Sequence, residues 1–107
     1  MRYVRTSIFK SDYRRLSEED EERFRQAVRV FNEACDRFIA TRDPSAWPAS
    51  LRVKQVRGAP GVWEMTWSFS GPDGKATWEW TSVTEGSVQR PAIRWRRIGD
   101  HRIFKDP

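Results

Sequence analysis

The sequence has few residues of the types that form covalent or metal cross-links. It contains one cysteine, Cys35, and one histidine, His101, among 107 residues. A single cysteine excludes an intrachain disulfide, so the reducing cytoplasm is the expected compartment. One cysteine and one histidine also fall short of the usual ligands of a zinc site, so we expect neither a metal nor another cofactor.

Long apolar runs are missing as well. No stretch approaches the length of a membrane span or of a signal-peptide core, so we expect a soluble protein without a membrane partner. The modest aliphatic content is offset by six tryptophans and six phenylalanines, since aromatic side chains bury a large area each. A length of 107 residues predicts a single domain, residues 1–107, with one core.

Positive charge is concentrated in the second half of the chain. Lysine and arginine number 20 against 15 aspartates and glutamates, which gives a net charge of +5. Residues 1–50 carry ten basic and nine acidic side chains, whereas residues 51–107 carry ten and six. This surplus predicts an anionic partner, such as nucleic acid or an acidic protein segment.

The first half of the chain has the patterns of one short strand and two helices. The strand is predicted over residues 2–5, and apolar residues at helical spacing predict a short helix over residues 9–16. Ser17 is a good N-cap, and the acidic run after it suits a helix N-terminus. A long apolar stripe then predicts a helix that continues to about Thr41 and ends before Asp43-Pro44.

The second half alternates apolar and polar residues, which is the pattern of strands. Four strands are predicted, over residues 51–58, 63–69, 75–81 and 92–98, with a long loop over residues 84–91. Helices that precede a run of hairpins predict an α+β domain. In it, two N-terminal helices pack on one face of a mainly antiparallel sheet of four to five strands.

The same alternation predicts what each face of the sheet carries. We expect five tryptophans to pack in the core rather than to stack on nucleic-acid bases: Trp63, Trp67, Trp78, Trp80 and Trp95. Trp47 lies outside any periodic segment and is not assigned. The opposite face is expected to be open to water and cationic, and it is predicted to bind phosphate through Arg52, Lys54, Lys75, Arg94 and Arg96.

His101 is the strongest single candidate for chemistry. It follows a predicted strand that presents Arg94 and Arg96 on one side. Imidazole exchanges protons near neutral pH, and Asp100 is placed to orient it. Cations on one face with a histidine at the strand end predict a site that binds a phosphodiester and moves protons beside it. The alternative is an incidental histidine near the C-terminus.

Three short motifs occur in an order typical of one group of bacterial toxins. Residues 51–58 read LRVKQVRG, residues 61–64 read GVWE, and residues 98–104 read IGDHRIF. With helices before them and a hairpin between, these motifs resemble the RelE/ParE superfamily over nearly the whole chain. The resemblance implies a RelE-like fold and a toxin of a type II toxin–antitoxin system, silenced by a cognate antitoxin protein.

The resemblance also implies metal-independent cleavage of messenger RNA, usually on the ribosome. In that chemistry the ribose 2′-OH attacks the neighbouring phosphorus, a base and an acid move protons, and cations stabilise the phosphoryl oxygens. The implied catalytic residues are His101, Lys54, Arg94, Arg96 and Glu64, with Glu79 as the alternative proton acceptor to Glu64. Contacts to RNA or phosphate are implied for Arg52, Arg57, Lys75, Arg97 and Arg102. Phe104 stands where some members have a catalytic tyrosine, so more of the chemistry falls to His101.

Two other functions remain open at this point. The same superfamily contains inhibitors of DNA gyrase that share the fold without ribonuclease chemistry, and such a member needs no His101. Independently of any family, the composition fits a small basic nucleic-acid-binding module without activity. The lone histidine on a basic face favours the ribonuclease.

Overall fold

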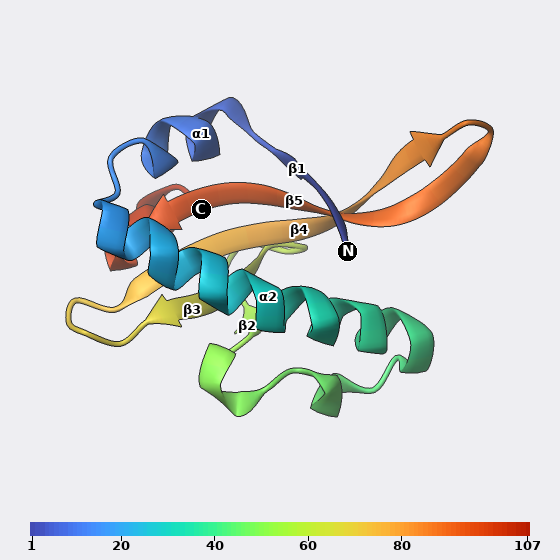
Figure 1. Ribbon diagram of the computed structural model, residues 1–107, viewed down its shortest axis with the longest axis horizontal. Coiled ribbons are helices and arrows are strands. Elements are labelled where there is room, and N and C mark those ends of the chain that lie inside the picture. Colours follow the sequence, from blue (N-terminus) through green and yellow to red (C-terminus); the bar gives the residue numbers. More distant parts are fainter.

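A five-stranded sheet forms one layer of the fold, and two helices pack on it (Figure 1). The computed structural model describes all residues from 1 to 107. The strands are β1 (Arg2–Arg5), β2 (Lys54–Gln55), β3 (Trp63–Ser68), β4 (Gly74–Glu85) and β5 (Val88–Gly99). The helices are α1 (Ser7–Tyr13) and α2 (Glu18–Thr41), with short 3-10 helices η1 (Pro44–Ala46), η2 (Ala49–Leu51) and η3 (His101–Lys105). The expected α+β class is therefore confirmed.

The sheet is mixed, which corrects the expectation of a mainly antiparallel one. Its strand order is β1-β5-β4-β3-β2. The pairs β2–β3, β3–β4 and β4–β5 are antiparallel, but β1 runs parallel to β5. A tight hairpin makes its two strands antiparallel. β1 is separated from β5 along the chain by both helices and three strands, so no hairpin sets the direction of β1 relative to β5.

Both predicted helices are present and begin at polar caps. The Thr6 hydroxyl accepts a hydrogen bond from the Phe9 amide at 3.0 Å, and the Ser17 hydroxyl accepts one from the Asp20 amide at 3.1 Å. The second helix ends at Thr41, as its apolar stripe predicts, and Arg42 caps it in the left-handed conformation with a φ of 58°. Neither helix has an apolar stretch of the length needed to cross a membrane.

The core forms where α2 packs on the tryptophan-bearing face of the sheet. The Phe31 ring lies 5.1 Å from the ring centroids of both Trp78 and Trp95, and all three side chains are buried. Trp47, which no pattern placed, stacks on Phe31 at 5.7 Å and on Phe38 at 5.4 Å. The predicted core role of the other tryptophans is confirmed, since all pack in or against this cluster: Trp63, Trp67, Trp78, Trp80 and Trp95.

Three predicted segments differ from the structure. The strand expected over residues 51–58 shrinks to β2, because η2 and a left-handed Arg52, with a φ of 46°, occupy its first half. Phe69 lies beyond the end of β3 and is 50% exposed instead of buried. The loop expected over residues 84–91 is paired strand, because the hairpin turns within two residues between Glu85 and Val88.

Asp12 of α1 takes the place of a missing strand at the edge of β5. β1 pairs with β5 only as far as Trp95, so the Ile98 amide beyond it has no strand partner on that side. The Asp12 carboxylate accepts a hydrogen bond from the Ile98 amide at 3.2 Å and one from the Arg97 guanidinium at 2.7 Å. Asp12 is itself 6% exposed, so α1 is fixed to the sheet by a buried charged contact.

Replacing Asp12 by alanine is expected to lower the free energy of unfolding by about 2–4 kcal/mol, because a buried amide and a guanidinium both lose their acceptor. Urea denaturation of the wild type and of Asp12→Ala measures the change. Glu33→Ala, an exposed change on α2, is the control and should alter stability by less than about 0.5 kcal/mol. Equal stability of the two variants would contradict this role of Asp12.

Candidate functional site

The sheet face turned away from α2 carries the polar residues that the alternation predicted. Residues opposite one another on adjacent strands share a face. The register aligns four such pairs: Lys54 with Glu64, Glu64 with Thr77, Thr66 with Lys75, and Glu79 with Arg94. We define the polar face as these residues together with Arg96: Lys54, Glu64, Thr66, Lys75, Thr77, Glu79, Arg94 and Arg96. Three of the predicted cations, Lys75, Arg94 and Arg96, therefore lie on one side of two adjacent strands, with Lys54 at the sheet edge.

Glu79 holds the two arginines of this face. Its Oε1 atom lies 2.9 Å from Arg94 Nη1, and its Oε2 atom lies 3.2 Å from Arg96 Nη1. The side chains of Glu79, Arg94 and Arg96 are 23%, 44% and 35% exposed, so water and a ligand both reach the cluster. Each carboxylate oxygen thus binds one guanidinium, and the pair of arginines is arranged around a single anionic group.

The part of the polar face on β3 and the start of β4 is buried, which corrects the expectation of an open surface. Glu64, Thr66 and Thr77 are 7%, 1% and 0% exposed. The Lys75 ammonium donates to the Thr66 hydroxyl at 2.8 Å and lies 3.8 Å from the Glu64 carboxylate. Glu64, the predicted proton acceptor, is therefore paired and shielded.

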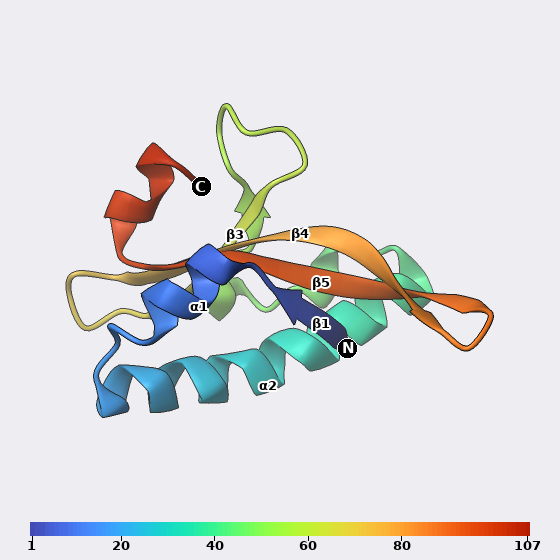
Figure 2. The same ribbon diagram turned by 90° about the horizontal axis from the view of Figure 1, so that it is seen from above.

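The C-terminal segment accounts for part of this burial. Both η3 and the β2–β3 loop rise on the side of the sheet opposite α2 (Figure 2). The chain returns from η3 so that the backbone carbonyl of Pro107 accepts hydrogen bonds from Thr77 Oγ1 at 2.9 Å and from Arg96 Nε at 3.1 Å. Of the predicted residues on this face, Lys54 is exposed, and Glu79, Arg94 and Arg96 are partly exposed.

A β-bulge separates the roles of two adjacent arginines. Trp95 pairs with Trp78 and Arg97 pairs with Thr77, so Arg96 is the extra residue of β5. The Arg97 guanidinium binds Asp12 and donates to the Asp106 carbonyl at 2.9 Å. Its hydrogen bond with Asp12 raises the pKa of Arg97 above the usual arginine value. The Arg97 guanidinium is therefore already used to hold α1, and its phosphate contact stays a prediction.

His101 is exposed and begins η3, directly after β5. Asp100 caps η3 by accepting a hydrogen bond from the Arg102 amide at 2.9 Å, and the Arg102 guanidinium lies 2.9 Å from the same carboxylate. The Arg102 side chain lowers the pKa of Asp100, and the nearby His101 adds to this effect. No hydrogen bond or ion pair joins His101 to the polar face. The structure therefore groups the arginines but leaves the imidazole as a separate exposed group.

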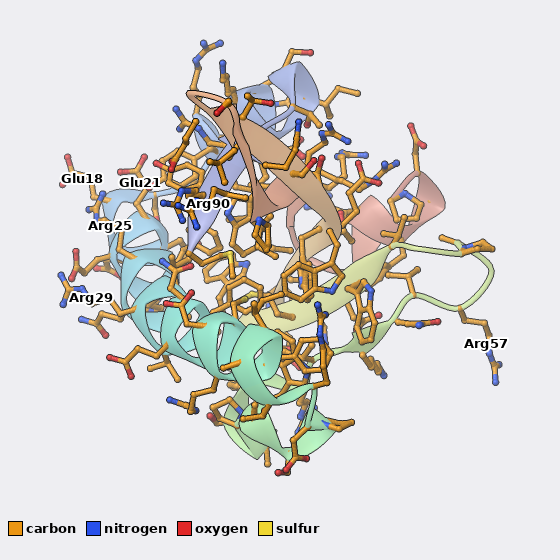
Figure 3. All side chains as sticks on the ribbon, turned by 90° about the vertical axis from the view of Figure 1, so that its right-hand side faces the viewer. Glu18, Glu21, Arg25, Arg29, Arg57 and Arg90 are labelled. Atoms are coloured by element: carbon orange, nitrogen blue, oxygen red, sulfur yellow. The ribbon has the colours of Figure 1, made fainter.

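The other predicted RNA contacts lie apart from the polar face. The Arg52 guanidinium lies 4.9 Å from the Phe69 ring centroid. Arg52 also borders a hollow that is lined by Trp47 and by Phe38 of α2, so it lies on the same side of the sheet as α2. Arg57 extends into solvent from the β2–β3 loop (Figure 3). Arg102 is paired with Asp100, although 77% of its side chain is exposed.

A hollow at the end of β5 does not have the character of a phosphate site. Its volume is about 700 Å³, and it lies between the α1–α2 turn, the β3–β4 loop and the end of β5. Each arginine that lines it is within 3.5 Å of a carboxylate: Arg15, Arg23, Arg97 and Arg102. Five carboxylates line it as well, so its charge is slightly negative: Asp12, Glu19, Asp20, Asp73 and Asp100.

Cys35 is fully buried in the core, and burial raises the pKa of its thiol to about 12. The thiolate that would act as a nucleophile or a metal ligand is therefore not formed at neutral pH. No group of three or more histidine, cysteine, aspartate or glutamate side chains is arranged to hold a metal ion.

Sequence reasoning missed Asp12, although a signal for it exists. Asp12 falls at helical spacing from Phe9 and Leu16, on the apolar side of the first helix. A buried carboxylate requires hydrogen-bond donors or a cation beside it, and an arginine-rich strand such as residues 92–98 can supply them.

The comparisons with known proteins add no relative. No protein-family model, curated protein or solved structure matches this chain.

Replacing Asp100 by alanine is expected to lower stability by about 0.5–1.5 kcal/mol at pH 7, since η3 loses its cap. The pKa of Asp100 is lowered in the folded protein, so its contribution is complete above the ordinary value of 3.8 and disappears as pH falls through the lowered one. Urea denaturation of both proteins at neutral pH and near pH 2 measures this. A stability difference that persists unchanged in acid would contradict the role of the carboxylate.

Proposed function

We propose that this protein is a RelE-like toxin that cleaves messenger RNA without a metal ion and is silenced by a cognate antitoxin. The observation that carries the proposal is the arginine pair of the polar face, Arg94 and Arg96, arranged around one anionic group on β5, the strand that precedes His101. Guanidinium groups suit phosphate oxygens, and the net charge of +5 attracts an RNA strand.

In the proposed reaction, Arg94 and Arg96 bind the non-bridging oxygens of the scissile phosphate. The ribose 2′-oxygen attacks the phosphorus while its proton passes to a base. The bond from phosphorus to the 5′-oxygen breaks, and that oxygen takes a proton from an acid, leaving a 2′,3′-cyclic phosphate and a 5′-hydroxyl. His101 is the proposed proton-transfer residue, since its side chain is exposed and imidazole is the group most often used for general acid–base catalysis.

The Glu64 carboxylate is less suited to the role of base. It is 7% exposed and lies beside the Lys75 ammonium, so it is shielded from an RNA hydroxyl and already paired with a cation. Lys54 is exposed at the edge of the sheet and is proposed to contact a neighbouring phosphate of the same strand.

A second candidate is a nucleic-acid-binding module that does not cleave. The observation that favours it is the absence of any hydrogen bond or ion pair between His101 and the polar face. In that case the arginines bind the backbone and no proton is transferred. Inhibition of DNA gyrase, the other function implied by the resemblance, requires neither His101 nor RNA.

Replacing His101 by alanine is expected to leave the protein folded and to reduce cleavage of translated messages by about 10²- to 10⁴-fold, because proton transfer is lost. Growth of cells after induction and sequencing of the 5′ ends of their transcripts measure the effect. Unfolding in urea should be unchanged, since the side chain is exposed.

The matched control is Lys105→Ala. Lys105, like His101, is an exposed side chain of η3 that carries a titratable nitrogen group. Growth arrest and cleavage should match the wild type. Full cleavage by His101→Ala would refute its assigned role. Growth arrest accompanied by DNA breaks in place of RNA ends would replace the ribonuclease with a gyrase inhibitor.

A further inference from the structure

We infer that Glu79 occupies the phosphate position of the arginine pair and that an RNA backbone binds by displacing it. This inference rests on the proposed function and adds a regulatory residue to the same site. Glu79 then determines how strongly RNA binds, because the strand must compete with a carboxylate that belongs to the protein.

The contacts of Glu79 match those of a bound phosphate. Its two oxygens accept from two different guanidiniums, Arg94 at 2.9 Å and Arg96 at 3.2 Å. A non-bridging phosphate oxygen accepts from arginine at the same range of distances and with the same charge. The two arginines are two residues apart on β5, so their side chains lie on the same side of the strand and are held at a fixed spacing.

Displacement is feasible because the cluster is partly exposed. Glu79 keeps 23% of its side chain accessible, so water competes for its two ion pairs and weakens them. An RNA strand offers several phosphates at once, and release of their counterions adds to the affinity. A single free anion has no such advantage, so the site selects a polyanion over inorganic phosphate.

The chain provides a closely matched control in Glu85. It also lies on β4, is 48% exposed, and pairs with two arginines, Arg2 and Arg90. It lies six residues further along the strand, roughly 20 Å from Glu79. Glu79→Gln and Glu85→Gln therefore make the same change in net charge, but only the first removes the carboxylate that binds Arg94 and Arg96.

Binding is measured with a single-stranded 2′-O-methyl RNA, which has no hydroxyl to attack phosphorus and is not cleaved. Glu79→Gln is expected to bind it about tenfold more tightly than the wild type at low salt, because the strand no longer has to displace a carboxylate from Arg94 and Arg96. Glu85→Gln should follow the wild type within about twofold. Adding Arg94→Ala and Arg96→Ala to Glu79→Gln should remove the gain.

The outcomes separate the two proposals. Equal tightening by Glu79→Gln and Glu85→Gln, or weaker binding by Glu79→Gln, overturns the displacement of Glu79 and leaves the proposed function standing. Absence of RNA binding by the wild type and by every variant overturns the proposed function and this inference together. Urea denaturation of each variant confirms that the folded protein is compared.

Discussion

The packing of Phe31 against Trp78 and Trp95 is the contact on which the rest of the structure depends. It buries one face of β4 and β5 under α2. Side chains alternate along a strand, so Glu79 and Arg94, next to these tryptophans, must point to the other face. The polar face is thus a consequence of the core. A shift of either strand by one residue would turn its tryptophans from the core to solvent. The large apolar area of these side chains makes such a shift costly.

The bulge in β5 modifies that rule at one position and gives the site its asymmetry. Strict alternation would turn Ile98 away from the core after Trp95. The extra residue restores Ile98 to the buried face and brings both Arg96 and Arg97 toward the polar side. Arg96 then meets Glu79, and Arg97 meets Asp12 of α1. Adjacent residues of the same type therefore serve two purposes, one at the candidate site and one in holding the first helix.

Charge acts at two ranges in this protein. The net charge of +5 acts over the whole surface and attracts any polyanion. Within the polar face, however, Glu79 offsets one of the two charges of Arg94 and Arg96, and Lys75 lies beside Glu64. Long-range attraction and this partial local compensation together favour a ligand that carries many negative charges over one that carries a single charge. A basic composition alone does not separate those two kinds of ligand.

The sequence by itself determined the two helices, the tryptophan core and the face on which Lys54, Arg94 and Arg96 lie. These features follow from periodicity and from caps within a few residues, which are local properties of the chain. Only the tertiary structure decided that β1 is parallel, that the C-terminal segment returns to bind Thr77, and that Arg94 and Arg96 share Glu79 while Arg97 binds Asp12. Those contacts join residues far apart in the chain, such as Asp12 and Arg97 at 85 positions, and no local pattern specifies which distant partners meet.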